Sequence, residues 1–263
     1  MERTTSKDGT TIAFERSGHG PAIVLVSGAL GDRSVAAPLA DRLASRSTVI
    51  TYDRRGRGDS GDVAPYSPRR EVEDLEALIG VVGGSASMFG HSSGGVLALE
   101  AARASPDRIP RLALYEPVFI VDDSRPLLPD DYLQRLEELV AANRRGDAVE
   151  YFMTRGVSAP PQSVASMRDG TFWPALEALA HTLPYDARIV EAGMTGDQAP
   201  LRRWAGLPVP TLVMNGTAGA PWLDAARALA DVLPDARYHA LEGQDHGPAA
   251  DVLAPVLDEF LAG

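Results

Sequence analysis

Strand-like and helix-like segments alternate along most of the chain, and this alternation limits the fold more than any other feature. Residues 22–26, Ala-Ile-Val-Leu-Val, form a continuous apolar run, as expected of a strand covered on both faces. Strands that alternate with helices pair in parallel through right-handed crossovers. The sequence therefore predicts an α/β fold with a mostly parallel, doubly wound sheet. Strands are expected at 11–15, 22–26, 48–52, 86–89, 111–116, 210–215 and 237–241, and helices at 36–46, 69–82, 96–102, 223–232 and 252–261.

The alternation stops between residues 117 and 206. Apolar residues recur there at helical spacing, no clear strand-like run is present, and prolines interrupt the pattern. We therefore predict that residues 117–206 form a helical cap. The cap is expected to be inserted into a core domain made of residues 1–116 and 207–263.

Composition restricts the partners of the chain. Its 263 residues have a net charge of −11, which disfavours nucleic acids and anionic membranes as partners. The absence of cysteine removes disulfides, thiolate metal sites and a cysteine nucleophile. No metal-ligand spacing and no phosphate-binding loop with its lysine is present, so no cofactor is expected. No apolar run approaches the roughly 20 residues that span a bilayer, and the first residues do not resemble a secretion signal, so a cytoplasmic location is expected.

Residues 90–94, Gly-His-Ser-Ser-Gly, match the pattern G-x-S-x-G between a predicted strand and a predicted helix. A tight turn of this kind strains the backbone of its central residue, and only small neighbours tolerate it. The turn exposes the Ser92 hydroxyl beside a helix N-terminus, where backbone N–H groups favour negative charge. We therefore expect Ser92 to be a nucleophile and the backbone N–H of Ser93 to be an oxyanion donor. His91 is expected to be a structural residue of the turn.

With this turn placed, the chain resembles the α/β-hydrolase superfamily over nearly its whole length. Residues 27–31, Ser-Gly-Ala-Leu-Gly, are similar to the family's oxyanion loop, with serine in place of the frequent histidine. Residues 52–60 are similar to the D-x-R-G-x-G-x-S stretch, and residues 243–247 resemble the loop of the catalytic histidine. The resemblance implies an oxyanion donor at the backbone N–H of Ala29 and a general base at His246.

The acid of a Ser–His–acid triad does not occupy its usual place in this sequence. In the family it commonly follows the strand expected here at 210–215, but that position is Gly219. Glu116 ends the strand after the nucleophile helix, where strand ends converge on a site. A group of haloalkane dehalogenases resembles this arrangement, and we therefore predict that Glu116 accepts the Nδ1–H of His246. The alternative carboxylates are Asp122, Asp123, Asp224 and Asp245, although the last adjoins the histidine and is poorly placed to reach its ring.

Two further groups of residues have a structural interpretation. The charged loop at 53–62 is expected to be a salt-bridged brace of the sheet edge rather than a phosphate or metal site. His181 and several bulky residues are candidates for a pocket wall, although such residues more often pack in a core. The bulky residues are Phe152, Met153, Trp173, Trp204 and Trp222.

Together these residues predict a cofactor-independent hydrolase that cleaves a carboxylic ester, lactone or thioester through an acyl-enzyme. The apolar content of the cap favours a small-molecule substrate with a medium-sized hydrophobic acyl or alkyl portion. The same triad also fits a cofactor-free perhydrolase or haloperoxidase, or an acyl-transfer or cyclisation enzyme. A non-catalytic ligand-binding protein is a further alternative, because one fold hosts many functions and Gly219 occupies the usual acid position.

Overall fold

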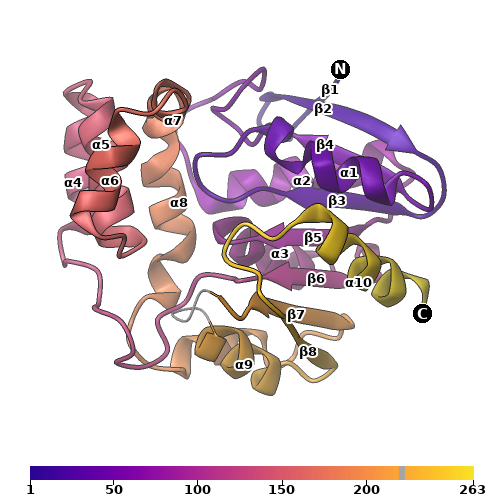
Figure 1. Cartoon of the computed structure of the whole chain (residues 1–263). Coiled ribbons are helices and arrows are strands. Elements are labelled where there is room, and N and C mark those ends of the chain that lie inside the picture. The colour runs from indigo at the N-terminus through magenta and orange to yellow at the C-terminus, as the bar shows by residue number, and fades with distance from the viewer. Residues whose placement is uncertain (219–222) are drawn as a thin grey trace.

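The computed structural model of the chain describes residues 1–218 and 223–263, and this part contains an eight-stranded sheet. Its strand order is β1-β2-β4-β3-β5-β6-β7-β8 (Figure 1). The pairs from β4 to β8 are parallel, whereas β2 pairs antiparallel with both β1 and β4. The predicted α/β fold with a mostly parallel sheet is confirmed. The strands are β1 Glu2–Thr5, β2 Thr11–Gly18, β3 Ala22–Val26, β4 Thr48–Tyr52, β5 Ser87–His91, β6 Leu112–Tyr115, β7 Thr211–Gly216 and β8 Ala236–Leu241.

The sequence does not predict strand β1 at the edge of the sheet. All four of its residues are exposed or half-buried, so no apolar alternation marks them. Backbone pairing with β2 forms the strand instead, with Glu2 opposite Phe14. Its charged side chains suit an edge position, because charges there disfavour pairing with a strand of another chain.

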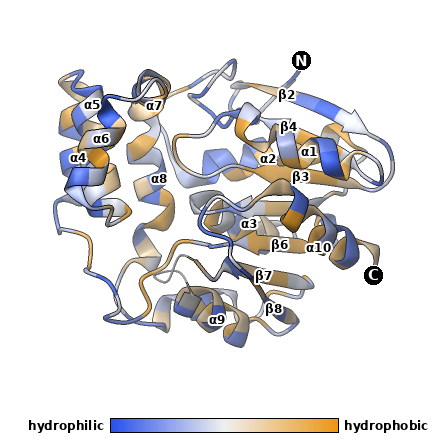
Figure 2. Cartoon of the chain, in the orientation of Figure 1, coloured by the Kyte–Doolittle hydropathy of each residue, from blue (hydrophilic) through white to orange (hydrophobic). Residues whose placement is uncertain are grey.

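Helices cover both faces of the sheet, and each face has its own hydrophobic core (Figure 1). Along β3, Val24 and Val26 pack with α2 and α3, whereas Ile23 and Leu25 point to the opposite face and pack with α1 and α10. Figure 2 shows the corresponding hydrophobic colour of the central strands. These helices, with the one that follows β7, are α1 Ala37–Leu43, α2 Pro68–Val81, α3 Ser93–Ala104, α9 Leu223–Val232 and α10 Ala250–Ala262.

Residues 117–206 are all described and contain helices but no strand. These helices lie at one end of the sheet, with α8 between the sheet and the other cap helices (Figure 1). They have a third hydrophobic core of their own, centred on Leu136, Val149 and Leu183. The exact domain boundaries stay a prediction. The helices are α4 Tyr132–Ala141, α5 Arg145–Tyr151, a π-helical turn Phe152–Gly156, α6 Pro161–Arg168, α7 Trp173–Leu179 and α8 Leu183–Val190.

The pairing of β5 with β6 places two predicted site residues next to each other. His91 at the end of β5 lies opposite Tyr115 at the end of β6, so the following residues, Ser92 and Glu116, emerge at the same edge. The backbone N–H of Ser92 donates to the Tyr115 carbonyl at 3.0 Å. No helix in the described ranges is both long and apolar enough to cross a membrane.

Candidate active site

Ser92 occupies a strained turn between β5 and α3. Its φ of 57° and ψ of −128° are rare for a residue with a side chain. The turn is tight, because a Cβ at Gly90 would lie 2.7 Å from the Gly94 carbonyl oxygen, and a Cβ at Gly94 would overlap the carbonyl oxygens of Val26 and Ser27. Glycine at these positions therefore permits the turn that presents the Ser92 side chain above the sheet edge.

Glu116 and His246 are directly bonded. Nδ1 of His246 lies 2.5 Å from Oε2 of Glu116, whose side chain is fully buried. The other carboxylate oxygen, Oε1, accepts from the backbone N–H of Gly216 at 3.0 Å. A carboxylate is acceptor-only, so the imidazole proton belongs on Nδ1 and the Nε2 atom carries the lone pair. This is the tautomer that a general base requires.

Three strands fix the loop that carries His246. The Tyr115 hydroxyl of β6 donates to the Asp245 carbonyl at 2.5 Å, and Nε2 of His91 in β5 donates to the His246 carbonyl at 2.7 Å. At the end of β7, a Cβ on Gly216 would overlap the Gln244 carbonyl oxygen, so the loop packs tightly over this glycine. His246 is therefore positioned through its backbone as well as through its ring.

His91 is a structural partner of this loop. Burial and then the nearby charge of His246 lower the pKa of His91 to about 3, even though part of its ring faces the cavity. The ring is therefore neutral near pH 7 and donates through Nε2. The two imidazole centroids lie 4.6 Å apart, but the hydrogen bond to a main-chain carbonyl leaves His91 in a supporting position.

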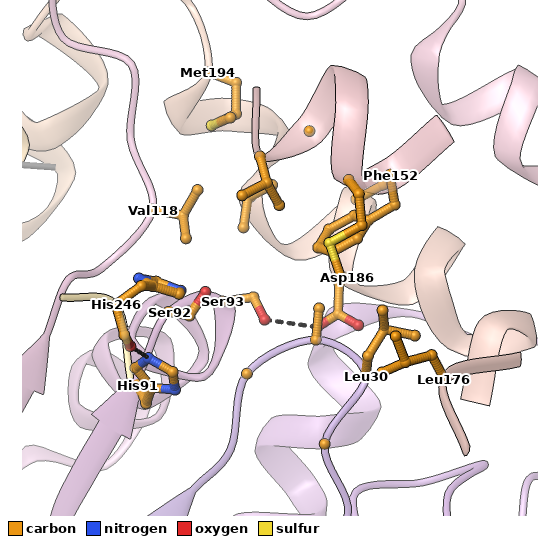
Figure 3. A pocket seen from close by; sticks show the side chains of 18 of the residues that line it. Leu30, His91, Ser92, Ser93, Val118, Phe152, Leu176, Asp186, Met194 and His246 are labelled. Atoms are coloured by element: carbon orange, nitrogen blue, oxygen red, sulfur yellow. Dashed lines mark hydrogen bonds between the residues drawn. The ribbon is translucent and has the colours of Figure 1, made fainter. Parts of the chain in front are cut away.

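Ser92 and His246 line one cavity of about 280 Å³ beneath the cap, and Figure 3 shows their side chains next to each other. Most of its other described lining residues are apolar and come from the cap and from the loop after β3. Phe152, Met153 and Gly156 belong to the π-helical turn, a feature that is frequent at functional sites. Further apolar lining residues are Leu30, Val35, Val118, Leu128, Val157, Leu176, Ala187, Val190 and Met194.

Two backbone N–H groups lie beside Ser92. Ser93 is the first residue of α3, and Ala29 lines the cavity from the loop after β3. Within the described part of the chain, no hydrogen bond uses the N–H of either residue. Gly28 brings the loop close, because a Cβ there would lie 2.8 Å from the Cβ of Ser92. Both N–H groups are thus candidate donors to an oxygen bound at Ser92.

A family model for the alpha/beta hydrolase family matches residues 23–259 of the chain. The chain belongs to the alpha/beta hydrolase family. It is similar to a crystal structure of an alpha/beta hydrolase from Sphaerobacter thermophilus, with 54% identity and a TM-score of 0.92, over 99% of this chain and 100% of that chain.

Two relatives with named activities are more distant from this alpha/beta hydrolase. An enol-lactonase from Burkholderia xenovorans LB400 is 25% identical, with a TM-score of 0.74 and full coverage of both chains. A 2-(acetamidomethylene)succinate hydrolase from Mesorhizobium japonicum is 26% identical over 247 residues, which are 90% of this chain and 85% of the relative. The hydrolase names of these relatives support a hydrolase.

Sequence reasoning missed Asp186 of this hydrolase, which pairs with two arginines of the loop predicted as a salt-bridged brace. Asp186 of α8 lies at the cavity wall, where Oδ2 accepts from Arg57 at 2.6 Å and Oδ1 accepts from Arg54 and from the Ser93 hydroxyl, each at 2.7 Å (Figure 3). Burial opposes the charged form of Asp186, but the two guanidinium groups outweigh it and lower the pKa of the carboxyl. A charged residue inside an apolar helical pattern is the signal that marks Asp186.

The alternative carboxylates lie elsewhere in the hydrolase. Neither Asp122 nor Asp123 lines the cavity of Ser92, and Asp224 is exposed on α9. Asp245 accepts the backbone N–H of Gly247 at 2.8 Å, which is a turn contact. Gly219 lies outside the described residues.

The other pocket candidates divide between wall and core. Phe152 and Met153 line the cavity, whereas Trp173 and Trp204 are buried in hydrophobic cores. His181 donates to the Gly56 carbonyl at 2.7 Å and does not line the described cavity, and Trp222 lies outside the described residues. Within the described residues, no cluster of His, Asp and Glu side chains is suited to a metal ion.

Proposed function

We propose that this alpha/beta hydrolase cleaves a carboxylic ester, lactone or thioester by nucleophilic catalysis at Ser92. The observation that carries the proposal is the bond between His246 and Glu116, because His246 lines the same apolar cavity as Ser92. A serine, an imidazole and a buried carboxylate in this relation form the arrangement that activates a hydroxyl nucleophile.

In the proposed reaction the Ser92 oxygen attacks the acyl carbon while Nε2 of His246 takes its proton. The carbonyl oxygen becomes an oxyanion, which accepts hydrogen bonds from the N–H groups of Ala29 and Ser93. His246 then gives the proton to the departing alcohol or thiol, leaving an acyl-enzyme. Water then attacks the acyl carbon and gives a proton to His246; the bond to Ser92 breaks, His246 returns the proton to the Ser92 oxygen, and the acid leaves. Glu116 stabilises the imidazolium in both steps.

The dimensions and chemistry of the cavity favour an uncharged, apolar acyl group. Among the described lining residues there is no lysine or arginine. The one carboxylate in the wall, Asp186, is already paired with two arginines. A substrate carboxylate would thus be buried without a partner, at a cost of several kcal/mol. We therefore expect an uncharged substrate, unlike the succinate derivative in the name of the Mesorhizobium relative.

The proposal is tested by intact-mass analysis after treatment with an alkyl fluorophosphonate, which reacts with activated serines. We expect one adduct on the wild type and none on Ser92→Ala. His246→Gln should label far more slowly, whereas His239→Gln, which changes an exposed histidine of β8, should label at the wild-type rate. An unlabelled wild type would instead indicate a non-catalytic ligand-binding protein.

A p-nitrophenyl ester series then distinguishes the hydrolase from its alternatives. We expect steady release of p-nitrophenol and of the free acid with water as the only acceptor. If Ser92 is labelled but the esters turn over only when hydrogen peroxide or an amine acceptor is supplied, hydrolysis is overturned in favour of perhydrolase or acyl-transfer chemistry.

A further inference from the structure

Four buried charged side chains connect the loop after β4, helix α2 and the cap. Arg54 binds both oxygens of Glu71, at 2.7 and 2.8 Å, and shares Asp186 with Arg57. All four side chains are almost inaccessible to solvent, with exposures of 1% to 4%. The two arginines and two carboxylates balance in charge. The proposed acyl transfer does not use any of them directly.

Arg57 also binds the oxyanion loop on both sides of its strained residue. Its Nη1 atom donates to the Gly28 carbonyl at 2.6 Å and to the Gly31 carbonyl at 3.0 Å. Between these carbonyls, Leu30 has a φ of 57°, which is unfavourable for a residue with a side chain. One guanidinium group therefore stabilises a loop conformation that the backbone alone disfavours.

This contact determines the direction of the Ala29 N–H. The Gly28–Ala29 peptide bond is trans, and the C=O and N–H of a planar trans peptide point in opposite directions. Since the Gly28 carbonyl points at Arg57, the Ala29 N–H points away from it, and Ala29 is itself one of the residues that line the cavity. The positive charge at the carbonyl also polarises the peptide group and makes its N–H a stronger donor.

Arg57 in turn depends on the cap. Its Nη2 atom donates to Oδ2 of Asp186, which lies on α8, and the same carboxylate accepts the side chain of Ser93 at the start of α3. Asp186 thus contacts groups on both sides of the site where the oxyanion would form. We propose that Arg57 and Asp186 are positioning residues, which orient the Ala29 N–H toward Ser92 only when α8 is docked.

The proposal rests on the proposed function, and the first experiment measures kcat and KM of Arg57→Lys with a p-nitrophenyl ester. A lysine retains the charge but cannot bind two carbonyls and a carboxylate together. We expect kcat to fall by about 10- to 100-fold with little change in KM, because the loss is confined to the transition state. The inhibition constant of an alkyl boronic acid, whose adduct with Ser92 carries an oxyanion-like oxygen, should rise in parallel.

Arg55→Lys is the matched control. Arg55 lies on the same loop, is equally buried, and binds Asp74 and Asp8, but among the described residues it donates no hydrogen bond to the oxyanion loop or to the cap. We expect Arg55→Lys to lower the unfolding temperature as Arg57→Lys does while kcat stays at the wild-type value. Equal losses of kcat in the two variants would show a merely structural effect and overturn the proposal.

Asp186→Asn tests the contact of Arg57 with the cap, and it replaces Arg57→Lys in the experiment if that variant does not fold. The amide keeps an oxygen for Arg54 and Ser93 but turns N–H groups toward Arg57, so kcat should again fall while KM changes little. A folded variant with wild-type kcat would overturn the proposal.

A crystal structure of the wild-type boronate adduct is independent of both variants, and an adduct oxygen that does not accept from the Ala29 N–H would also overturn the proposal. If the proposal on Arg57 and Asp186 is overturned but the fluorophosphonate still labels Ser92 of the wild type, the proposed hydrolase function stands. If the wild type is not labelled, the proposed function itself fails.

Discussion

Glu116 reaches its position through an unusual backbone conformation. Its φ is 44°, and its backbone N–H donates to the Met214 carbonyl at 2.8 Å, as if β6 continued for one more residue. The side chain leaves the strand there and places one oxygen on Gly216 and the other on His246. A carboxylate with both oxygens bonded inside the protein has a fixed orientation, which is what a partner for an imidazole requires.

We expect Glu116→Gln to lower kcat by about 100- to 10,000-fold, because the amide changes the preferred imidazole tautomer and cannot stabilise the imidazolium. Steady-state kinetics on a p-nitrophenyl ester measure this effect, and circular dichroism confirms the fold. Asp224→Asn is the control, since Asp224 is exposed on α9, and it should keep the wild-type kcat. The opposite result would assign the acid to Asp224.

His91 gives a prediction for acid stability. Its pKa is about 3 in the folded protein and about 6.5 in an unfolded chain, so the unfolded state binds more protons between these values. The free energy of unfolding should therefore fall as the pH drops from 6.5 toward 3. The variant His91→Gln can still donate to the His246 carbonyl, but its side chain does not bind a proton in this pH range. Urea titrations from pH 7 to 4 should therefore show that its free energy of unfolding changes less steeply with pH than that of the wild type, by about 1 kcal/mol per pH unit around pH 5. Equal slopes would mean that the folded protein tolerates a charged His91.

The sequence predicts the residues whose role depends on local structure. Ser92 and His246 are marked by their neighbours in the chain, and Glu116 by its position at a strand end. Arg57 and Asp186 are different, because they are 129 residues apart and meet only when the cap packs on the core. The charged loop at 53–62 is predicted as a brace, but the sequence does not reveal that it braces the oxyanion loop.

Among the elements, the loop after β3 is the most constrained. Its glycine at position 28 lies against Ser92, and Arg57 binds its carbonyls. Gly28→Ala would place a Cβ 2.8 Å from the Cβ of Ser92, so the loop has to move and its N–H group with it. We expect a fall in kcat of about 10- to 100-fold, measured with a p-nitrophenyl ester.

Gly80→Ala is the control for this substitution, because a Cβ at that position in α2 has no neighbour within 4 Å. Alanine also favours a helix over glycine, so this variant should be at least as stable as the wild type and fully active. Full activity of Gly28→Ala would show that the loop is not close-packed against the serine.

Element prediction succeeds where burial leaves a pattern. The central strands are apolar on both faces, and α2 has a clear helical period. β1 is missed because it is polar and stabilised by its partner strand. The π-helical turn at Phe152–Gly156 is also missed, since its extra residue per turn leaves no distinct apolar period over five residues.

At the scale of the whole molecule, the apolar cavity beneath the cap predicts that the enzyme discriminates between charged and uncharged substrates. We compare the p-nitrophenyl monoester of adipic acid with its methyl-capped diester, which has the same chain but no charge. Because the described lining contains no lysine or arginine, the free carboxylate should lower kcat/KM by at least about 100-fold. Equal kcat/KM values would mean that the carboxylate reaches solvent or a cation.

The two halves of the candidate machinery come from distant parts of the polypeptide. The serine and the glutamate directly follow neighbouring strands in the first half, whereas the histidine follows β8, 130 residues after the glutamate. During synthesis, the alcohol and the carboxylate can assemble before the imidazole has left the ribosome. In the proposed mechanism, a nascent chain that stops before His246 would therefore lack its base, and it should cleave esters far more slowly than a chain that includes His246.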